Sequence, residues 1–209
     1  MKILLKLFLN TMIIYSIFLF VGCAPSKATL KTYVDPAIQS ASIKSIAVFA
    51  LRNTSISPGE ALDLDRAMTQ SFLQKNRNIS IIGSSEATKK LNDAGLVEAY
   101  SNFLLDFARS GIPNTATLKK IGSELGVDAI LQGNLGDVIQ RDASYGVTAL
   151  TSLTFRYTLL STQSGNILWE GTSSARKEKT PMWSKAPPIY EVIDLAHKKV
   201  LDGLPTLGK

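Results

Sequence analysis

Two long stretches of alternating side chains, joined by a short turn, constrain the fold of this 209-residue chain more than any other feature. From Val147 to Leu159 apolar residues alternate with Thr, Ser and Arg, and the alternation resumes from Ile167 to Gly171 after a turn at 162–165. A period of two places apolar side chains on one face of a strand and polar side chains on the other. The sequence therefore predicts an antiparallel hairpin with one buried face and one largely polar face.

The segment before this hairpin alternates between strand and helix signals. A short apolar run at 44–51 predicts a buried strand, and Ser57-Pro58-Gly59-Glu60 combines a capping serine with a proline at the first helical position. A second strand is expected at 79–82, followed by helices at 86–94, 97–108 and from Asn114 to Gly126, and then by a strand from Ala129. This order is typical of parallel crossovers.

The C-terminal part predicts a basic, proline-containing loop and a final helix. The loop spans 176–188, and the helix turns Ile189, Val192, Ile193, Ala196 and Val200 inward. The expected fold class is therefore α/β (α+β): a mixed sheet of about five strands with parallel crossovers, an antiparallel C-terminal hairpin and flanking helices.

The first residues have the pattern of a secretory leader. Lys2 and Lys6 supply positive charge, and a mostly apolar stretch from Leu7 to Val21 follows. An uncleaved membrane helix is the alternative, because the stretch from Met1 is about the 20 residues that span a bilayer. Both interpretations place the remainder of the chain outside the cytoplasm.

The end of the leader, Phe20-Val21-Gly22-Cys23, resembles the bacterial lipobox, although Phe20 stands where leucine is usual. The resemblance implies cleavage before Cys23, a diacylglycerol on its sulfur and a further acyl chain on the new amine. Several acyl chains anchor a protein durably, whereas one binds marginally. Ala24, not aspartate, follows Cys23, and this resembles the address of outer-membrane lipoproteins.

Three segments follow from these patterns. Residues 1–22 are expected to be a lipoprotein signal peptide, and 23–43, with Pro25, Pro36 and no sustained periodicity, a lipidated N-terminus and flexible tether. Residues 44–209 are expected to form a single periplasmic α/β domain. With its single cysteine, the chain cannot form an intrachain disulfide, so packing must stabilise that domain.

The charge of the chain argues against nucleic-acid binding. The formal net charge is +6, and removal of Lys2 and Lys6 with the leader leaves +4. The basic residues occur as scattered pairs, without the dense stripe and interleaved aromatics of a nucleic-acid surface. Weak attraction to anionic envelope surfaces is the functional alternative to a solvated surface.

Residues capable of chemistry do not form a recognisable set. The sequence has no metal-spaced Cys/His motif, phosphate loop or G-x-S-x-G motif. Asp63 and Asp65 are expected on a solvated helix face, His197 as a partly exposed helix residue, and Trp169 as a core residue. Asp137, Arg141 and Asp142 lie near a loop, where a polar site is possible but a solvated position is favoured. We therefore expect no catalytic, metal-binding or cofactor-binding residues; Cys23 is the only functional position predicted.

Three segments together resemble a family of envelope lipoproteins. They are the strand 44–51, the stretch from Ile121 to Gly133 and the hairpin from Ser164 to Glu170. The family includes the curli secretion channel subunit and the lipoprotein activator of a penicillin-binding protein, and its domain is similar to the N-terminal domain of the Tol propeller protein. The resemblance implies a non-enzymatic role in binding another envelope protein or in self-association.

Three functional hypotheses remain at this point. The first is a lipid-anchored, non-enzymatic interaction or assembly module at the periplasmic face of the outer membrane, with inner-membrane anchoring as the less favoured location. The second is a ring-forming outer-membrane secretion or transport component. The channel branch of the family inserts extra hairpins, whereas the residues between Gly133 and Ile167 are all needed for the sheet, so no pore is predicted. The third is an envelope hydrolase with an unrecognised site.

Overall fold

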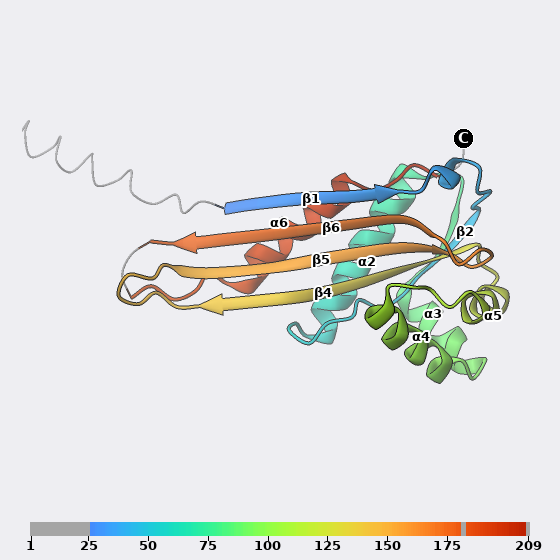
Figure 1. Cartoon of the computed structure of the whole chain (residues 1–209), viewed down its shortest axis with the longest axis horizontal. Helices are drawn as coiled ribbons and strands as arrows, with labels where there is room; N and C mark the ends of the chain where they lie inside the picture. The colour runs from blue at the N-terminus through green and yellow to red at the C-terminus, as the bar shows by residue number, and fades with distance from the viewer. Residues whose placement is uncertain (1–25, 181–182, 208–209) are drawn as a thin grey trace, which may run out of the picture.

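A six-stranded mixed sheet organises the computed structural model, which describes residues 26–180 and 183–207. The strand order is β1-β6-β5-β4-β2-β3. The strands are β1 (Ser26–Val34), β2 (Ser45–Val48), β3 (Ser80–Ile82), β4 (Ala129–Arg141), β5 (Ala149–Ser161) and β6 (Ile167–Lys179). Figure 1 shows the four long strands extending beyond the short pair β2 and β3. The expected mixed α/β class is confirmed, with one strand more than predicted.

Parallel pairing involves the short strand β2 and both of its neighbours. β2 pairs in parallel with β3 on one side and with β4 on the other. The crossovers are α2 (Pro58–Lys75), between β2 and β3, and α3 (Ser84–Asp93), α4 (Val97–Ser110) and α5 (Thr115–Leu125), between β3 and β4. This half of the sheet follows the predicted strand and helix order.

The remaining strands are antiparallel. β4 pairs with β5, and β5 pairs with β6 across the predicted hairpin turn, where Gly165 has a φ of 77°. β6 continues to Lys179, so the predicted basic loop from Arg176 is wrong over its first four residues. Those residues extend the sheet because each has a partner on β5, from Arg176 opposite Ser152 to Lys179 opposite Ala149.

A flexible tether is predicted for residues 23–43, but the described part of this segment is folded. Residues 26–34 form β1, which pairs along its whole length with β6, from Ser26 opposite Lys177 to Val34 opposite Trp169. A short 3-10 helix, η1 (Pro36–Gln39), follows and buries Ile38 completely. The folded domain therefore includes Ser26 onward and does not begin at Lys44.

Local capping signals operate as predicted. The Ser57 hydroxyl accepts from the Glu60 backbone N–H at 3.3 Å, while the Glu60 carboxylate accepts from the Ser57 backbone N–H at 2.8 Å. Asn114 caps α5 through its side chain, and Gly126 ends that helix in the left-handed conformation. These contacts satisfy backbone groups that the first and last helical turns leave unpaired.

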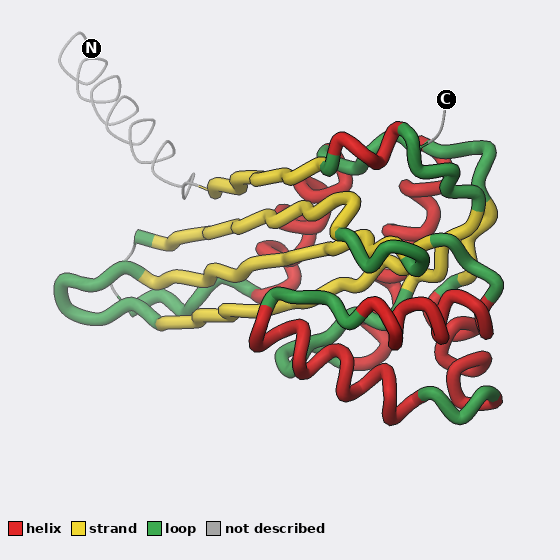
Figure 2. The backbone as a smooth tube through the Cα atoms, turned by 45° about the vertical axis from the view of Figure 1, so that its right-hand side comes forward, coloured by secondary structure: helices red, strands yellow, loops and turns green. Residues whose placement is uncertain are grey.

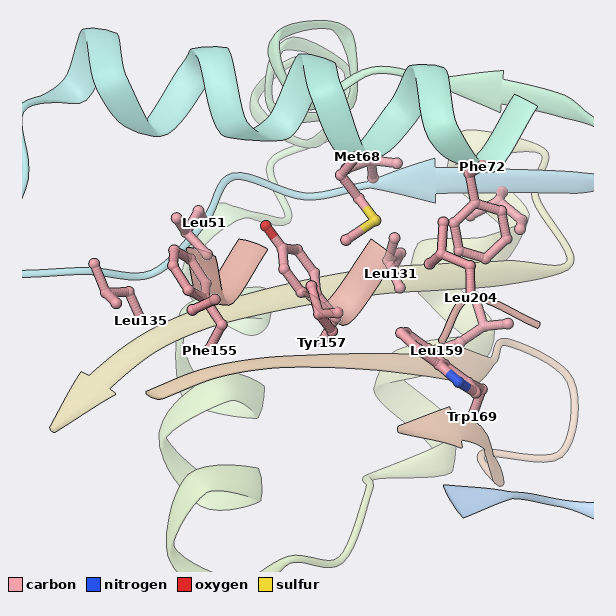
Figure 3. Close-up of a cluster of buried hydrophobic side chains, with 14 of the residues drawn as sticks. Leu51, Met68, Phe72, Leu131, Leu135, Phe155, Tyr157, Leu159, Trp169 and Leu204 are labelled. Atoms are coloured by element: carbon pink, nitrogen blue, oxygen red, sulfur yellow. The ribbon is translucent and has the colours of Figure 1, made fainter. Parts of the chain in front are cut away.

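The two faces of the sheet are covered unequally. α2 and α6 (Ile189–Asp202) pack on one face, where Met68 and Phe72 of α2 meet Tyr157, Leu159 and Leu131 (Figure 3). The other face carries a second core cluster beneath α3, α4 and α5, which includes Phe49, Ile130 and Leu160. These three helices gather at one end of the sheet and leave the long strands beyond them bare (Figure 2).

Candidate interaction surface

The bare side of the long strands presents a polar surface, which we call the open face. Leu153, Phe155, Tyr157 and Leu159 of β5 belong to the core under α2 and α6, so the alternate side chains point to the opposite side. With their neighbours in register, the members of the open face are Lys27, Thr29, Lys31, Tyr33, Asn134, Ser152, Thr154, Arg156, Glu170, Thr172, Ser174 and Arg176.

Strand pairing arranges these side chains in rows across the sheet. Thr29, Ser174 and Thr154 form one row, in which the hydroxyls of Thr154 and Ser174 lie 3.2 Å apart. The next row contains Arg156, whose Nε lies 3.8 Å from a carboxylate oxygen of Glu170. Cross-strand pairs of this kind hold polar side chains in fixed relative positions.

Two hollows lie on the open face. One, of about 310 Å³, lies where the C-terminal end of α4 meets the sheet, and Arg52, Asn134 and Arg156 line it together with the apolar Leu104 and Phe107. The second, of about 410 Å³, lies farther along the same strands. It is lined by Lys27, Thr29, Ser152, Thr154, Ser174 and Arg176, among others. The open face is therefore contoured, with side chains that can enclose a projecting group.

The charge of the open face is positive. Its basic members are Lys27, Lys31, Arg156 and Arg176, and its acidic member is Glu170. Glu178 continues the same side of β6 and pairs with Arg176, while Arg52 and Asp137 line the two hollows. Basic side chains still outnumber acidic ones. The Arg156 and Arg176 side chains are more than half exposed, at 57% and 56%. Hydroxyl, ammonium and guanidinium groups together offer many hydrogen-bond donors. Chemically, this surface suits carboxylates and backbone carbonyls of a partner.

A separate group of polar side chains is buried on the other side of the sheet. Asp65, Tyr157, Ser173 and His197 are at most 4% exposed, and each has a buried side-chain atom without a hydrogen-bond partner in the described part of the chain. Solvated positions are predicted for Asp65 and His197, and both predictions are wrong. Asp65 lies on the buried stripe of α2 with Ala61, Met68 and Phe72, and His197 on that of α6 with Ile193 and Val200.

Burial shifts the pKa of each titratable group here in the direction that favours its uncharged form. It raises the pKa of Asp65 to about 6, against hydrogen bonds from the Leu51 backbone N–H and the Ser84 side chain. It lowers the pKa of His197 to about 4, although the nearby Asp194 opposes the shift. Burial and the nearby Asp65 also raise the pKa of Tyr157. Between about pH 4 and 6 the poorly solvated interior therefore holds all three groups in their neutral forms.

These buried groups do not converge on one cavity. Asp65 borders a hollow between α2 and the start of α3, whereas His197 borders a different hollow between α2 and α6. No group of three or more His, Cys, Asp or Glu side chains is placed to hold a metal ion in residues 26–180 and 183–207. The open face is the better candidate for a functional surface, because its side chains are accessible and share a chemistry.

Comparisons with known proteins give structural likenesses only. No protein-family model matches the sequence, and no curated protein matches it. Among solved structures, the PelC dodecamer from Paraburkholderia phytofirmans is 12% identical and has a TM-score of 0.43; the match covers 84% of this chain and 94% of that one.

Two further structures resemble the chain to a similar extent. Lipoprotein GNA1162 from Neisseria meningitidis is 18% identical with a TM-score of 0.39, covering 76% of this chain and 99% of that one. The LpoB C-terminal domain from Salmonella enterica is 14% identical with a TM-score of 0.39, and the match covers 63% of this chain and 81% of that one. All three scores are below 0.5, so the functional proposals below rest on the residues of this chain.

Trp169, Asp137, Arg141 and Asp142 do not come together in one site. Trp169 is fully buried and donates from Nε1 to the Gly203 carbonyl at 3.0 Å, which confirms its core position. Asp142 pairs with Lys185 in a loop, Arg141 is the last residue of β4, and Asp137 lies at a bulge within that strand, so the three do not form a site. Cys23 lies outside the described residues, and none of the described helices is long and apolar enough to cross a membrane.

The sequence did not predict the open face as a candidate surface. The polar residues of β5 are expected on one face of the hairpin, but Lys27, Thr29 and Lys31 belong to a segment predicted as a tether. Their alternation with Ala28 and Leu30 is the signal that could have revealed the strand.

Proposed function

We propose that this chain is a lipid-anchored, non-enzymatic lipoprotein of the bacterial envelope whose open face binds another envelope protein. The observation that carries the proposal is the unequal covering of the sheet. One face of the long strands is covered by α2 and α6, whereas the other lies bare beyond α3, α4 and α5 (Figure 2). That bare face presents rows of hydrogen-bond donors to solvent. An uncovered sheet face with this polarity is stable in water and remains available to a partner.

The chemistry of the open face indicates the kind of partner. On the open face and its hollows, five basic side chains (Lys27, Lys31, Arg52, Arg156 and Arg176) outnumber three acidic ones (Asp137, Glu170 and Glu178). This excess favours an acidic protein surface. Because Arg156 and Arg176 are exposed, their attraction for a partner should weaken as ionic strength rises. The open face has a single aromatic residue, Tyr33 at its end, so it lacks the interleaved stacking residues of a nucleic-acid surface.

The anchor is assigned to Cys23 on the basis of the leader and the lipobox resemblance. We place the protein at the periplasmic face of the outer membrane, because Ala24 follows the cysteine. Metabolic labelling with a palmitate analogue tests this assignment. The full-length wild-type chain should incorporate label and fractionate with outer membranes, and Cys23→Ser should do neither. A Cys23→Ser chain that is still processed and membrane-bound would overturn the anchor.

Partner binding is tested by crosslinking in cells followed by affinity purification of the full-length protein. Arg156→Glu reverses a charge in the middle of the open face and should deplete the co-purified partner. Arg66→Glu is the matched control, since Arg66 is similarly exposed in a surface ion pair, with Asp63, but lies on α2. Recovery of the same partner from both variants would contradict binding at the open face.

Self-association is the second candidate function, and the free edge of β1 is the observation that favours it. β1 is the outermost strand of the sheet and is nine residues long. A long, exposed edge strand offers unpaired backbone groups to another chain. A second copy could therefore extend the sheet, and native mass spectrometry of detergent extracts would detect the resulting oligomer.

A further inference from the structure

We propose that the tip of the long strands contacts the surface of a phospholipid bilayer. The tip consists of residues 142–147, in the β4–β5 loop, and residues 183–186, which precede α6. This inference rests on the proposed anchoring at Cys23, and it adds a second, non-covalent contact that would fix how the domain stands on the membrane.

The tip exposes two large aromatic side chains. Tyr145 is 87% exposed and Trp183 is 75% exposed, and Val147 in the same loop and Ile139 near the end of β4 are also exposed. Trp183 has a φ of 67°, a left-handed conformation that bulky residues rarely adopt. Strained backbone of this kind is maintained where surrounding structure determines it, commonly at functional positions.

Contacts between the two loops hold the tip together. The Ala143 backbone N–H donates to the Ser184 carbonyl at 2.9 Å, and the Ala186 N–H donates to a carboxylate oxygen of Asp142 at 2.8 Å. Lys185 Nζ lies 2.8 Å from the other oxygen of Asp142. The aromatic side chains therefore project from a defined platform and need little ordering on contact.

Basic residues surround this platform. Arg141 ends β4, Lys179 is the last residue of β6, and Lys27 is the second residue of β1. Lys177 lies nearby but pairs with Glu191 of α6. Tyr and Trp are enriched at the membrane–water interface because their rings are apolar and their polar groups hydrogen-bond. Basic side chains next to them attract anionic headgroups. The combination favours a bilayer over an apolar protein groove.

The position of the tip agrees with the position of the anchor. Ser26 lies opposite Lys177, two residues before the end of β6, so β1 begins at the same end of the sheet as the tip (Figure 1). Cys23 is three residues before Ser26, which limits their separation to about 10 Å. Acyl chains on Cys23 would thus hold the tip, rather than the helical end, near the headgroups.

Tryptophan fluorescence tests the contact directly, because the chain has two tryptophans in contrasting positions. Trp169 is fully buried in the core, and Trp183 is at the tip. The full-length protein is reconstituted into vesicles of phosphatidylethanolamine and phosphatidylglycerol with brominated acyl chains, which quench only nearby rings. We expect loss of most of the Trp183 emission, obtained as the difference between wild type and Trp183→Phe, with little change in Trp169.

The matched control moves the exposed indole to the other end of the same sheet. Tyr33 is 51% exposed near the far end of β1, so the double variant W183F/Y33W should show no bromine quenching beyond that of Trp169. Flotation of the vesicles separates the two proposals. If the protein floats but Trp183 is not quenched, or if an indole at position 33 is quenched equally, the tip contact alone is overturned. Protein that does not float overturns both the tip contact and the anchor.

Discussion

Asp65 on α2 and His197 on α6 are buried ionisable residues whose pKa values shift in opposite directions. The folded-state pKa of Asp65 is raised from 3.8 to about 6, so the folded chain keeps a proton that the unfolded chain releases. Rising pH across this window therefore favours unfolding. The pKa of His197 is lowered from 6.5 to about 4, so rising pH across nearly the same window favours folding. The two contributions oppose each other between about pH 4 and 6.5.

Removing either group should expose the contribution of the other. Asp65→Asn should give a free energy of unfolding that rises by about 2–3 kcal/mol from pH 4 to pH 7, since each pKa unit is about 1.4 kcal/mol. His197→Phe, which keeps a ring against Phe155 and Tyr157, should give a fall of similar size. Urea denaturation at several pH values measures both slopes.

The exposed neighbour Asp63 provides a control on the same helix. Asp63→Asn makes the same chemical change at a side chain that is 75% exposed and should follow the wild-type profile. If Asp65→Asn and His197→Phe shifted stability in the same direction with pH, the assignment of these two buried groups would be contradicted.

Gly122 allows α5 to approach the turn after β5. A Cβ at this position would lie 2.4 Å from Cβ of Thr162, whose hydroxyl donates to the Val127 carbonyl at 2.8 Å. Gly122→Ala should therefore lower the free energy of unfolding by about 1–3 kcal/mol through overpacking. Gly59→Ala is the control, because Gly59 also lies in a helix, α2, and the only atom within 4 Å of its Cβ position is Ser57 Oγ at 4.0 Å, so alanine there should not lower stability. Stabilisation by Gly122→Ala, the usual effect of alanine in a helix, would contradict the close packing.

At the scale of the elements, the predictable parts are those with strong local signals. The capping box at Ser57 and Glu60 and the boundaries of α5 at Asn114 and Gly126 follow from side chains that act within one turn. The paired alternation of β5 and β6 was also sufficient to predict the hairpin. Asp65 and His197 lie at helical spacing from core residues. Their burial was not predicted, because ionisable side chains are usually solvated.

β1 was not predictable in the same way because it is an edge strand. Its open-face residues are polar, and on the core side only Ala28 and Leu30 are partly buried against the cluster. The strand is specified by its pairing with β6, which lies near the other end of the sequence, and not by its own hydrophobic pattern.

Proline substitutions in β1 test whether copies of the chain associate through its free edge. The Asp35 N–H donates to the Leu168 carbonyl, so alternation directs the N–H of Lys31 towards β6 and that of Thr32 outward. Thr32→Pro should leave the fold intact, since proline is tolerated where the N–H faces solvent, and it should abolish any oligomer formed through this edge. Lys31→Pro, the control, should destabilise the β1–β6 pair.

Native mass spectrometry and thermal unfolding of both variants distinguish the possibilities. An oligomer that persists in Thr32→Pro would show that β1 is not the contact, whereas a loss of stability in Thr32→Pro comparable to that in Lys31→Pro would contradict the assigned strand register.

At the scale of the whole molecule, the two faces of the long strands differ in how they are covered. α2 and α6 build the core on one face (Figure 3). The opposite face carries the hollows and basic residues proposed to bind a partner. This division was not predictable from the sequence, because it depends on how far α3, α4 and α5 extend along the sheet. The alternation within β5 shows which side chains share a face, but not which face the helices leave uncovered.

The most direct test of the account is photocrosslinking from a single position in living cells. A photoreactive phenylalanine analogue replaces Ser174, which is exposed in the middle of the open face, or Asp63, which is exposed on α2, in the full-length chain. We expect a discrete adduct with a second envelope protein from position 174, which Arg156→Glu removes, and no such adduct from position 63. Equal adducts from both positions, or an adduct from position 63 alone, would contradict the open face as the binding surface.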